Sequence, residues 1–232
     1  MDLIEACSKG DINTVLRLVK SKWNLNLVNK DDDTALNLAT YEGYIDIVRI
    51  LVNAGADLNI QNDSGLTALM IATIMGYPEI VKLLLKTNLN LQCSDGRTAL
   101  FSACQDNKKD IVTTLLEAGT DPNIPDCHTN TPLFIASSEG YTDIVKLLVK
   151  FGADVNIQTS YSLWTPLIAA CSIGHISTVK TLLEAGADPN IRDKQSMTAL
   201  SITFRRRILS IEKLLIQFGA NPMILLQLTF RV

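Results

Sequence analysis

The sequence predicts an all-α solenoid of about seven helix-turn-helix units, and three features of the 232 residues predict it. A phrase of the form Thr-Ala/Pro-Leu-x-x-Ala recurs, a glycine follows its threonine by nine residues, and a second apolar stretch ends at another glycine. Repeats of about 33 residues stack on their neighbours and bury one continuous core. The phrases follow this period, with one shorter and one longer interval, and begin at Thr34, Thr67, Thr98, Thr131, Thr165 and Thr198.

The phrase marks the first helix of each repeat. Its threonine suits the N-cap, and alanine or proline suits the first helical position, where no backbone N–H is needed. Leu36 and Ala39 share one helical face. Leu3 and Ala6 fall one full period earlier, so the opening segment fits the same frame without the threonine. The helix then stops at a residue that tolerates the left-handed conformation: Gly43, Gly76, Asn107, Gly140 or Gly174.

A second helix follows each stop. Ile47, Val48 and Leu51 give it an apolar face in the second repeat. A polar loop of the type Ala-Asp-Leu-Asn-Ile-Gln then leads to the next threonine. The second helix ends at a glycine in most repeats: Gly55, Gly119, Gly152, Gly186 and Gly219.

This pattern resembles the ankyrin repeat, whose signature is Thr-Pro-Leu-His-x-Ala on a 33-residue period. The resemblance covers residues 1–222 and implies an L-shaped repeat whose connecting loops form a row of β-turn fingers. The histidine of the signature is replaced in every repeat, and we expect the fold to survive because the threonine cap and the leucine remain. The replacements are Asn37, Met70, Phe101, Phe134, Ile168 and Ser201.

The last repeat departs most from the pattern. The seventh has Thr203 for the small alanine, Arg207 for the glycine and Glu212 for an apolar valine, so we expect a degenerate capping repeat. We expect the apolar tail to fold back over the outer face of that repeat or to continue into a lost eighth one. The expected boundaries are 1–33 (N-terminal capping repeat), 34–66, 67–97 (shortened), 98–130, 131–164, 165–197, 198–222 (degenerate C-terminal repeat) and 223–232 (apolar tail).

The third repeat lacks two residues where other repeats read Gly-Ala-Asp, and its text runs Lys86-Thr87-Asn88-Leu89-Asn90. We predict a tightened turn in which Asn88 or Thr87 ends the helix in place of glycine. The neighbouring repeats should still stack, because the leucines of the core keep their places.

Composition excludes several classes of protein. The net charge of -3 and the pI of about 5.4 leave no basic footprint for nucleic acid. No apolar run approaches the ~18 residues of a membrane-spanning helix, and the start of the chain does not have the form of a secretion signal. Five cysteines without paired spacing favour a reducing compartment. We therefore expect an intracellular, most simply cytoplasmic, monomer with no membrane or nucleic-acid partner.

No constellation of residues predicts catalysis, a metal or a cofactor. Cys7, Cys104 and Cys171 occupy one repeat position that also takes Thr and Ser, so we interpret them as small core residues. Cys127-His128 cannot supply the three or four ligands that a metal needs. Neither histidine has a nucleophile and an orienting acid that can be named beside it. The sequence thus predicts a protein that is not an enzyme.

Partner-binding residues are expected at two places in each repeat. One is directly before the threonine, near the fingertips, and the other is the end of the first helix. In proteins that this pattern resembles, both places face a concave groove, and large apolar and Arg side chains are favoured there. Trp164 could instead pack between fingers, and the Arg205–Arg207 run could be a solvated helix end. The candidates are Tyr41, Glu42, Leu66, Ile74, Met75, Arg97, Gln105, Asp106, Glu139, Trp164, Ile173, Met197, Arg205 and Arg206.

The predicted function is a scaffold or adaptor that binds another protein through this groove. An alternative is an inhibitory or localising regulatory subunit of an enzyme. Glu42, Asp106 and Glu139 come early in the chain, whereas Arg192, Lys194, Arg205 and Arg206 come late. A partner with a basic end, an apolar middle and an acidic end would complement this order.

Four loop asparagines recur after an apolar residue or a proline. The resemblance implies that an iron-dependent dioxygenase could hydroxylate such asparagines. The alternative is that each one only hydrogen-bonds its own loop. The four are Asn59, Asn123, Asn156 and Asn190.

Overall fold

The computed structural model describes residues 2–224, and every element in that range is an α-helix. The chain divides into an N-terminal half, Met1–Asp121, and a C-terminal half, Pro122–Val232. The helices of the N-terminal half are α1 (Leu3–Ser8), α2 (Ile12–Lys20), α3 (Ala35–Tyr41), α4 (Ile45–Asn53), α5 (Ala68–Met75), α6 (Pro78–Leu84), α7 (Ala99–Gln105) and α8 (Lys109–Glu117). Those of the C-terminal half are α9 (Pro132–Ser138), α10 (Thr142–Lys150), α11 (Pro166–Ile173), α12 (Ile176–Glu184), α13 (Ala199–Arg206) and α14 (Leu209–Gln217).

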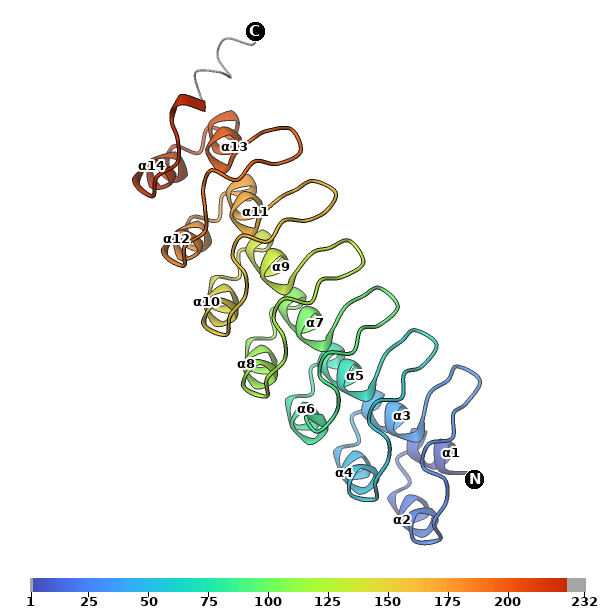
Figure 1. The fold of residues 1–232 in the computed structure, drawn as a ribbon. Helices are drawn as coiled ribbons and strands as arrows, with labels where there is room; N and C mark the ends of the chain where they lie inside the picture. The colour runs from blue at the N-terminus through green and yellow to red at the C-terminus, as the bar shows by residue number, and fades with distance from the viewer. Residues whose placement is uncertain (1, 225–232) are drawn as a thin grey trace. The chain divides into compact units, whose positions relative to one another are not determined.

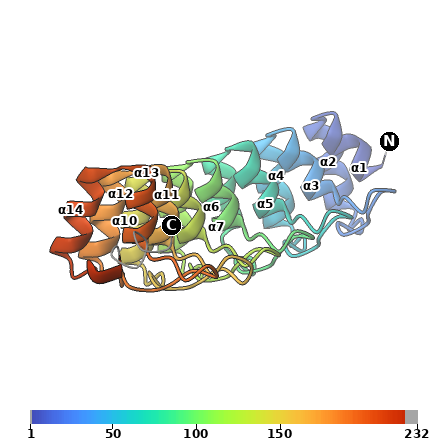
Figure 2. The same cartoon turned by 90° about the horizontal axis from the view of Figure 1, so that it is seen from above.

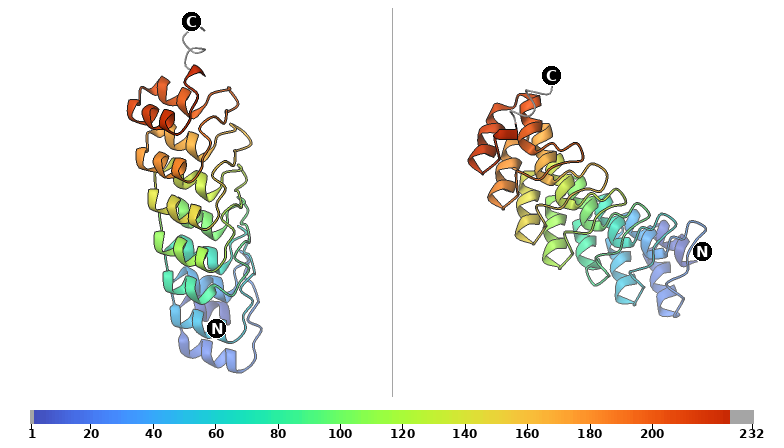
Figure 3. Two further views of the ribbon diagram at one scale, coloured as in Figure 1. Left: turned by 60° about the vertical axis from the view of Figure 1, so that its left-hand side comes forward. Right: turned by 45° about the horizontal axis from the view of Figure 1, so that its top comes forward.

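Each half is a stack of helix pairs. Within a half, the odd-numbered helices form one layer beside the finger loops, and the even-numbered helices form a second layer on the other side (Figure 1). Successive pairs repeat the same orientation within a half (Figure 3). The fingers of each half lie on one side of its helices (Figure 2). Neighbouring odd helices pack on each other, as α3 does on α5 and α11 does on α13.

The threonine caps are confirmed. In all six phrases the hydroxyl accepts a hydrogen bond from the backbone N–H three residues later, as Thr34 Oγ1 does from Asn37 at 3.1 Å. The left-handed stops are also confirmed. Gly43 has φ 76°, and Asn107 takes the same region at φ 56° in place of glycine. Local chemistry therefore begins the first helix of the six phrase-bearing repeats, and ends five of those helices, as predicted.

The core consists of the positions that recur in the phrase. Leu36, Leu100 and Leu167 are at most 1% exposed, and the small alanine is fully buried in the six repeats that have it. Cys7, Cys104 and Cys171 are buried free thiols, as expected for core residues. Burial raises the pKa of the Cys7 thiol to about 12 and raises the pKa of Cys104 and Cys171 as well, because a thiolate would lose its hydration there. These thiols therefore stay protonated and unreactive at neutral pH.

The shortened third repeat differs from the expectation. Helix α6 ends at Leu84 and its cap residue, Leu85, is right-handed, so neither Thr87 nor Asn88 ends the helix in the place of glycine. The helix has seven residues, whereas α4 has nine, so the deletion is absorbed at the end of α6. The repeats nevertheless stack, because α6 packs on both α4 and α8.

The last repeat keeps its fold without the usual residues. Arg207 occupies the left-handed stop at φ 58°, and Thr203 replaces the small alanine. The Thr203 hydroxyl is fully buried and donates to Leu200 O at 3.0 Å, so its polar group is satisfied inside the helix. The predicted fold-back of the tail falls largely on residues 225–232, which lie outside the described residues.

Candidate partner-binding surface

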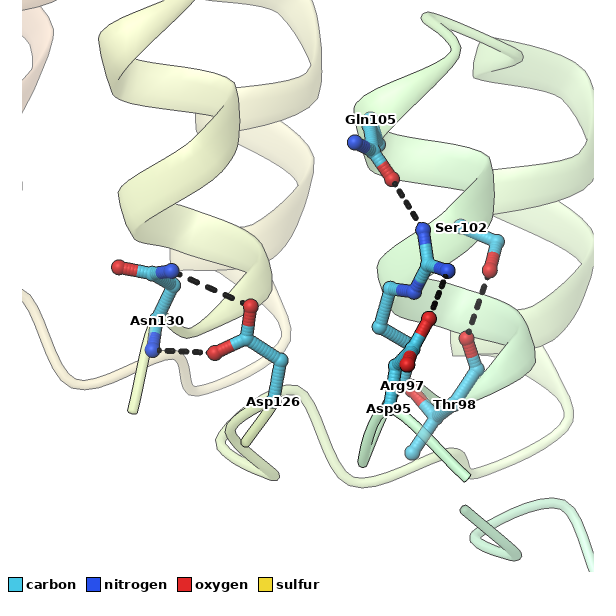
Figure 4. A network of polar contacts seen from close by, with 7 residues as sticks. All are labelled: Asp95, Arg97, Thr98, Ser102, Gln105, Asp126 and Asn130. Carbon is cyan, nitrogen blue, oxygen red and sulfur yellow. Dashed lines mark hydrogen bonds and ion pairs between the residues drawn. The ribbon is translucent and has the colours of Figure 1, made fainter. Parts of the chain in front are cut away.

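A hydrogen bond in the fourth repeat shows which positions share one face. Arg97 precedes the threonine of α7, and its Nη1 donates to Gln105 Oε1 at the far end of the same helix, at 3.2 Å (Figure 4). Its Nη2 forms an ion pair with Asp95 Oδ2 at 2.6 Å. The residue before the threonine and the residue eight positions later therefore lie on the same side of the first helix. We call this side, with the finger beside it, the finger-side surface of a repeat.

The finger-side surface of the N-terminal half exposes apolar side chains. Tyr41 is 56% exposed at the end of α3, and Ile74 and Met75 are 42% and 38% exposed at the end of α5. Because α3 packs directly on α5, these side chains come from adjacent helices. Leu66, at the base of the finger before α5, is half-buried.

Two acidic candidates of this half differ in their partners. Glu42 is exposed and has no ion pair among the described residues. Asp106 is exposed but pairs with Lys108 Nζ at 2.6 Å. Lys108 Nζ also donates to Ile74 O at 2.7 Å, where a cation stabilises the C-terminal end of α5. Glu42 is thus the freer of the two carboxylates.

The C-terminal half presents a different set on its finger-side surface. Ile173 is 56% exposed at the end of α11, and Glu139 is exposed at the end of α9. Arg205 and Arg206 are exposed at the end of α13 and have no ion-pair partner within residues 2–224. Two unpaired guanidinium groups beside one apolar side chain form a cationic surface.

Two candidates near the fingertips are less accessible than expected. The structure contradicts the expectation of an exposed Met197, which is only 8% exposed. Its N–H binds Asp193 Oδ1 at 2.8 Å, so the turn that Asp193 closes holds Met197 inward. Trp164 is half-buried, and its indole Nε1 donates to Asp193 Oδ2 at 3.3 Å. The Trp164 ring therefore packs toward the next finger.

The fingers are closed by one shared turn position. In most fingers the backbone N–H of this residue donates to the carbonyl four residues later, and where the residue is Asn or Asp its side chain accepts further N–H groups. In the C-terminal half, Asp126 Oδ1 accepts the Asn130 N–H at 2.8 Å and Asp126 Oδ2 accepts its amide at 3.1 Å (Figure 4). In the N-terminal half, Asn62 Oδ1 accepts the Leu66 N–H at 2.9 Å.

The loop asparagines form a ladder from one repeat to the next. Asn59 Oδ1 accepts the N–H of Asn88 at 2.8 Å, and Asn156 Oδ1 accepts the N–H of Asp188 at 2.9 Å. These side chains therefore bind the following loop. Two further members escaped the sequence reading, although they share the repeat position: Asn26 and Asn90, which accept from Asp57 and Asp121.

Sequence reasoning also missed Tyr161, which is 83% exposed at a fingertip of the C-terminal half. The signal was the interval between Thr131 and Thr165, which is one residue longer than the usual period. The Lys194 ammonium lies 5.0 Å from the centre of the Tyr161 ring. We therefore add Tyr161, an inserted aromatic residue beside the Lys194 cation, to the candidate partner-binding residues.

The described residues hold no group of three or more His, Cys, Asp or Glu side chains that could bind a metal ion. Among them, no helix has the length and apolar character that would carry it across a bilayer. Some polar side chains of the finger-side surface bind backbone groups or one another, as Arg97 and Asp126 do, whereas Glu42, Arg205 and Arg206 have no ion pair among the described residues. This arrangement is suited to recognising another surface.

The structure is that of a helical repeat protein. Its helix pairs stack, six of its first helices begin at threonine caps and end at left-handed residues, and its fingers are closed by hydrogen bonds. A family model for ankyrin repeats in three copies matches residues 3–93, 54–126, 85–159, 121–193 and 159–225. The chain belongs to the ankyrin-repeat family, whose domains generally mediate protein–protein interactions.

Solved structures agree with the family. The ankyrin repeat domain of Bcl-3, described as a unique member of the IkappaB protein family, is similar at a TM-score of 0.82 and 30% identity, over 91% of this chain and 97% of that one. The human ASB11 ankyrin repeat domain shares the fold at a TM-score of 0.74 and 24% identity, over 96% and 99% of the two chains. No curated protein matches the sequence.

Proposed function

We propose that the chain is a scaffold or adaptor that holds another protein on the finger-side surface of its repeats. One observation carries the proposal. Tyr41, Ile74 and Met75 expose 56%, 42% and 38% of their surface on two adjacent helices, at positions that build no core. Covering such side chains with a partner removes apolar area from water, which favours association.

The difference in charge between the two halves supports one orientation of the bound partner along the chain. Residues 1–121 contain 16 Asp and Glu side chains against 11 Lys and Arg side chains, whereas Arg205 and Arg206 are unpaired among the described residues. We infer that a basic segment of the partner meets the N-terminal half and an acidic segment meets the C-terminal half. Electrostatic complementarity of this kind sets orientation and association rate more than affinity. All five cysteines are free thiols, which supports a reducing, intracellular location.

The test uses two isoleucines of nearly equal exposure in the N-terminal half. Ile74 is 42% exposed at the end of α5 on the finger-side surface, and Ile12 is 40% exposed on α2 in the other layer. A partner is first isolated by pulldown from the native cell, and its affinity for the purified full chain is then measured by calorimetry. Ile74→Ala should weaken binding about 30-fold, equivalent to about 2 kcal/mol, if the side chain is a hot spot.

The Ile12→Ala variant is the control and should bind as the unchanged chain does. Both variants should keep the same melting temperature, because neither side chain is buried. Normal binding of Ile74→Ala together with lost binding of Ile12→Ala would place the partner on the second helices and overturn the proposal.

A regulatory role is the second candidate, favoured by the similarity to a domain from the IkappaB protein family. If the isolated partner is an enzyme, its rate measured with a saturating amount of the chain separates the two. An unchanged rate supports a scaffold, whereas inhibition that Ile74→Ala relieves supports a regulatory subunit.

A further inference from the structure

The finger that carries Tyr161 is built differently from the others. In most fingers the turn residue donates its N–H to the carbonyl four residues later, as Asn62 does to Leu66 O at 3.1 Å. Here Thr159 donates to Trp164 O, five residues later, at 3.0 Å. The extra residue therefore lies in the fingertip, and the side chain displayed there is 83% exposed.

This fingertip is fastened to the next finger of the C-terminal half at three points. The Lys194 N–H donates to Ser162 O at 2.9 Å, and Gln158 Nε2 donates to Arg192 O at 3.0 Å. The third point is the hydrogen bond from the Trp164 indole to Asp193. These hydrogen bonds hold the inserted segment in one conformation, so less conformational entropy is lost when a partner binds.

The adjacent finger adds uncompensated positive charge. Arg192 and Lys194 are exposed and flank Asp193, which is 7% exposed, where the loop enters the turn at Lys194. Within residues 2–224 neither cation has a carboxylate partner. Lys194 instead lies over the Tyr161 ring at 5.0 Å.

Apolar contact is available beside these charges. Leu163 follows Tyr161 by two residues, is 38% exposed and holds the left-handed conformation at φ 55°. That conformation is uncommon for a residue other than glycine, and it persists here because the hydrogen bonds around it hold the loop. The tip thus presents an aromatic ring, a leucine and two cations on two joined fingers.

We propose that this fingertip platform, formed by Tyr161, Leu163, Arg192 and Lys194, binds a partner segment in which an Asp or Glu adjoins an apolar residue. The carboxylate pairs with Lys194 and Arg192, and the apolar side chain covers the Tyr161 ring and Leu163. The proposal rests on the scaffold function and specifies the chemistry of the segment that the C-terminal half recognises. A carboxylate at Lys194 relieves an unpaired charge, and the cation over the ring is retained.

The experiment selects short random peptides displayed on phage against the immobilised full chain. A parallel selection uses Lys194→Glu, and a third uses Lys146→Glu, which makes the same charge change at an exposed position of α10. Peptides enriched on the unchanged chain and on Lys146→Glu should carry an acidic residue next to an apolar one. On Lys194→Glu the preference should shift toward Lys and Arg.

Affinities of the selected peptides then locate the contact. Tyr161→Ser should weaken binding about tenfold, and Tyr41→Ser in the N-terminal half should leave it unchanged. Enrichment of neutral or basic peptides on the unchanged chain, or an unchanged preference on Lys194→Glu, would overturn the proposal. If Ile74→Ala binds the partner normally while the peptide results match the expectation, the proposed binding surface of the N-terminal half is wrong and the fingertip platform stands. The two proposals can therefore fail separately.

Discussion

The two halves of the molecule each contain a repeat whose length departs from the usual period, and they absorb the departure in different places. In the N-terminal half the third repeat lacks two residues, and α6 shortens while the asparagine ladder continues through Asn59 and Asn88. In the C-terminal half the fifth repeat gains one residue, and the fingertip lengthens around Tyr161.

This difference follows from what the stack constrains. The leucine and the small residue that ends each phrase are buried, and the loop asparagine must meet an N–H of the next repeat. A helix end and a fingertip are the segments between these constraints, so length changes are confined to them. The deletion shortens a helix, whereas the insertion displays a large side chain. Insertions in fingertips are therefore the places to search for function in such chains.

The largest difference in stability between the two halves should come from Gly→Ala substitutions at the left-handed stops. A Cβ at Gly140 would lie 2.6 Å from His175 Nδ1, whereas at Gly43 it would lie 3.0 Å from a Tyr77 ring carbon, and both glycines have φ 76°. His175 cannot easily withdraw, because its Nε2 donates to Ser138 O at 3.0 Å. We expect Gly140→Ala to cost about 3 kcal/mol and Gly43→Ala about 2 kcal/mol in urea denaturation. Gly152→Ala, with φ 88° and open space around it, should cost about 1 kcal/mol. Equal losses in all three would show that packing contributes nothing.

The loop asparagine beside the deletion should contribute more to stability than an asparagine elsewhere in the ladder. Asn59 Oδ1 accepts two hydrogen bonds there, from Asn88 N at 2.8 Å and from Thr87 Oγ1 at 2.7 Å. Asn156 Oδ1 accepts one, from Asp188 N at 2.9 Å, and the Asn156 amide makes only a long hydrogen bond to Gly186 O, at 3.5 Å. We expect Asn59→Ala to destabilise by about 2 kcal/mol and Asn156→Ala by about 1 kcal/mol. Amide hydrogen exchange at Asn88 and Asp188 provides a local measurement, and unchanged protection of Asn88 in Asn59→Ala would contradict the account.

Replacing buried, unpaired hydroxyls should produce smaller changes, which raise the stability of either half. Thr73 in α5 and Ser137 in α9 are fully buried, and their side-chain oxygens have no hydrogen-bond partner among the described protein atoms. Replacing a buried, unpaired hydroxyl with an apolar group of similar shape removes its desolvation penalty. We expect Thr73→Val and Ser137→Ala each to raise stability by up to about 1 kcal/mol, measured by thermal unfolding. A loss of stability in both would show that these hydroxyls are satisfied.

The smallest effect on stability should come from removing the insertion itself. Deleting Tyr161 restores the usual spacing of the phrases, and its exposed side chain builds no core. We expect the unfolding free energy to change by less than about 0.5 kcal/mol. Peptide binding at the fingertip platform should nevertheless be lost. A large loss of stability would mean that the longer tip is structural, and the contrast between the two halves would then fail.

Most of the helices, the six threonine caps, five left-handed stops, the stacking and the family could be predicted from the amino-acid sequence alone. These features depend on short-range chemistry, such as the Thr34 cap and the Gly43 stop, or on a period that alignment of the chain on itself reveals. Deletion and insertion were visible in the same spacing, although the residue that would end α6 was predicted wrongly.

The accessibility of the recurring positions, and the groups that they bind, depend on the folded arrangement and could not be predicted from the sequence. Met197 and Leu66 occupy one repeat position, yet Met197 is buried and Leu66 is half-buried. Arg97 reaches along α7 to Gln105, and the asparagines reach into the next loop. Tyr161 lies beside Lys194, which belongs to the next finger and is distant in the sequence. These outcomes depend on side-chain directions and on the distance between neighbouring fingers, and a periodic pattern specifies neither.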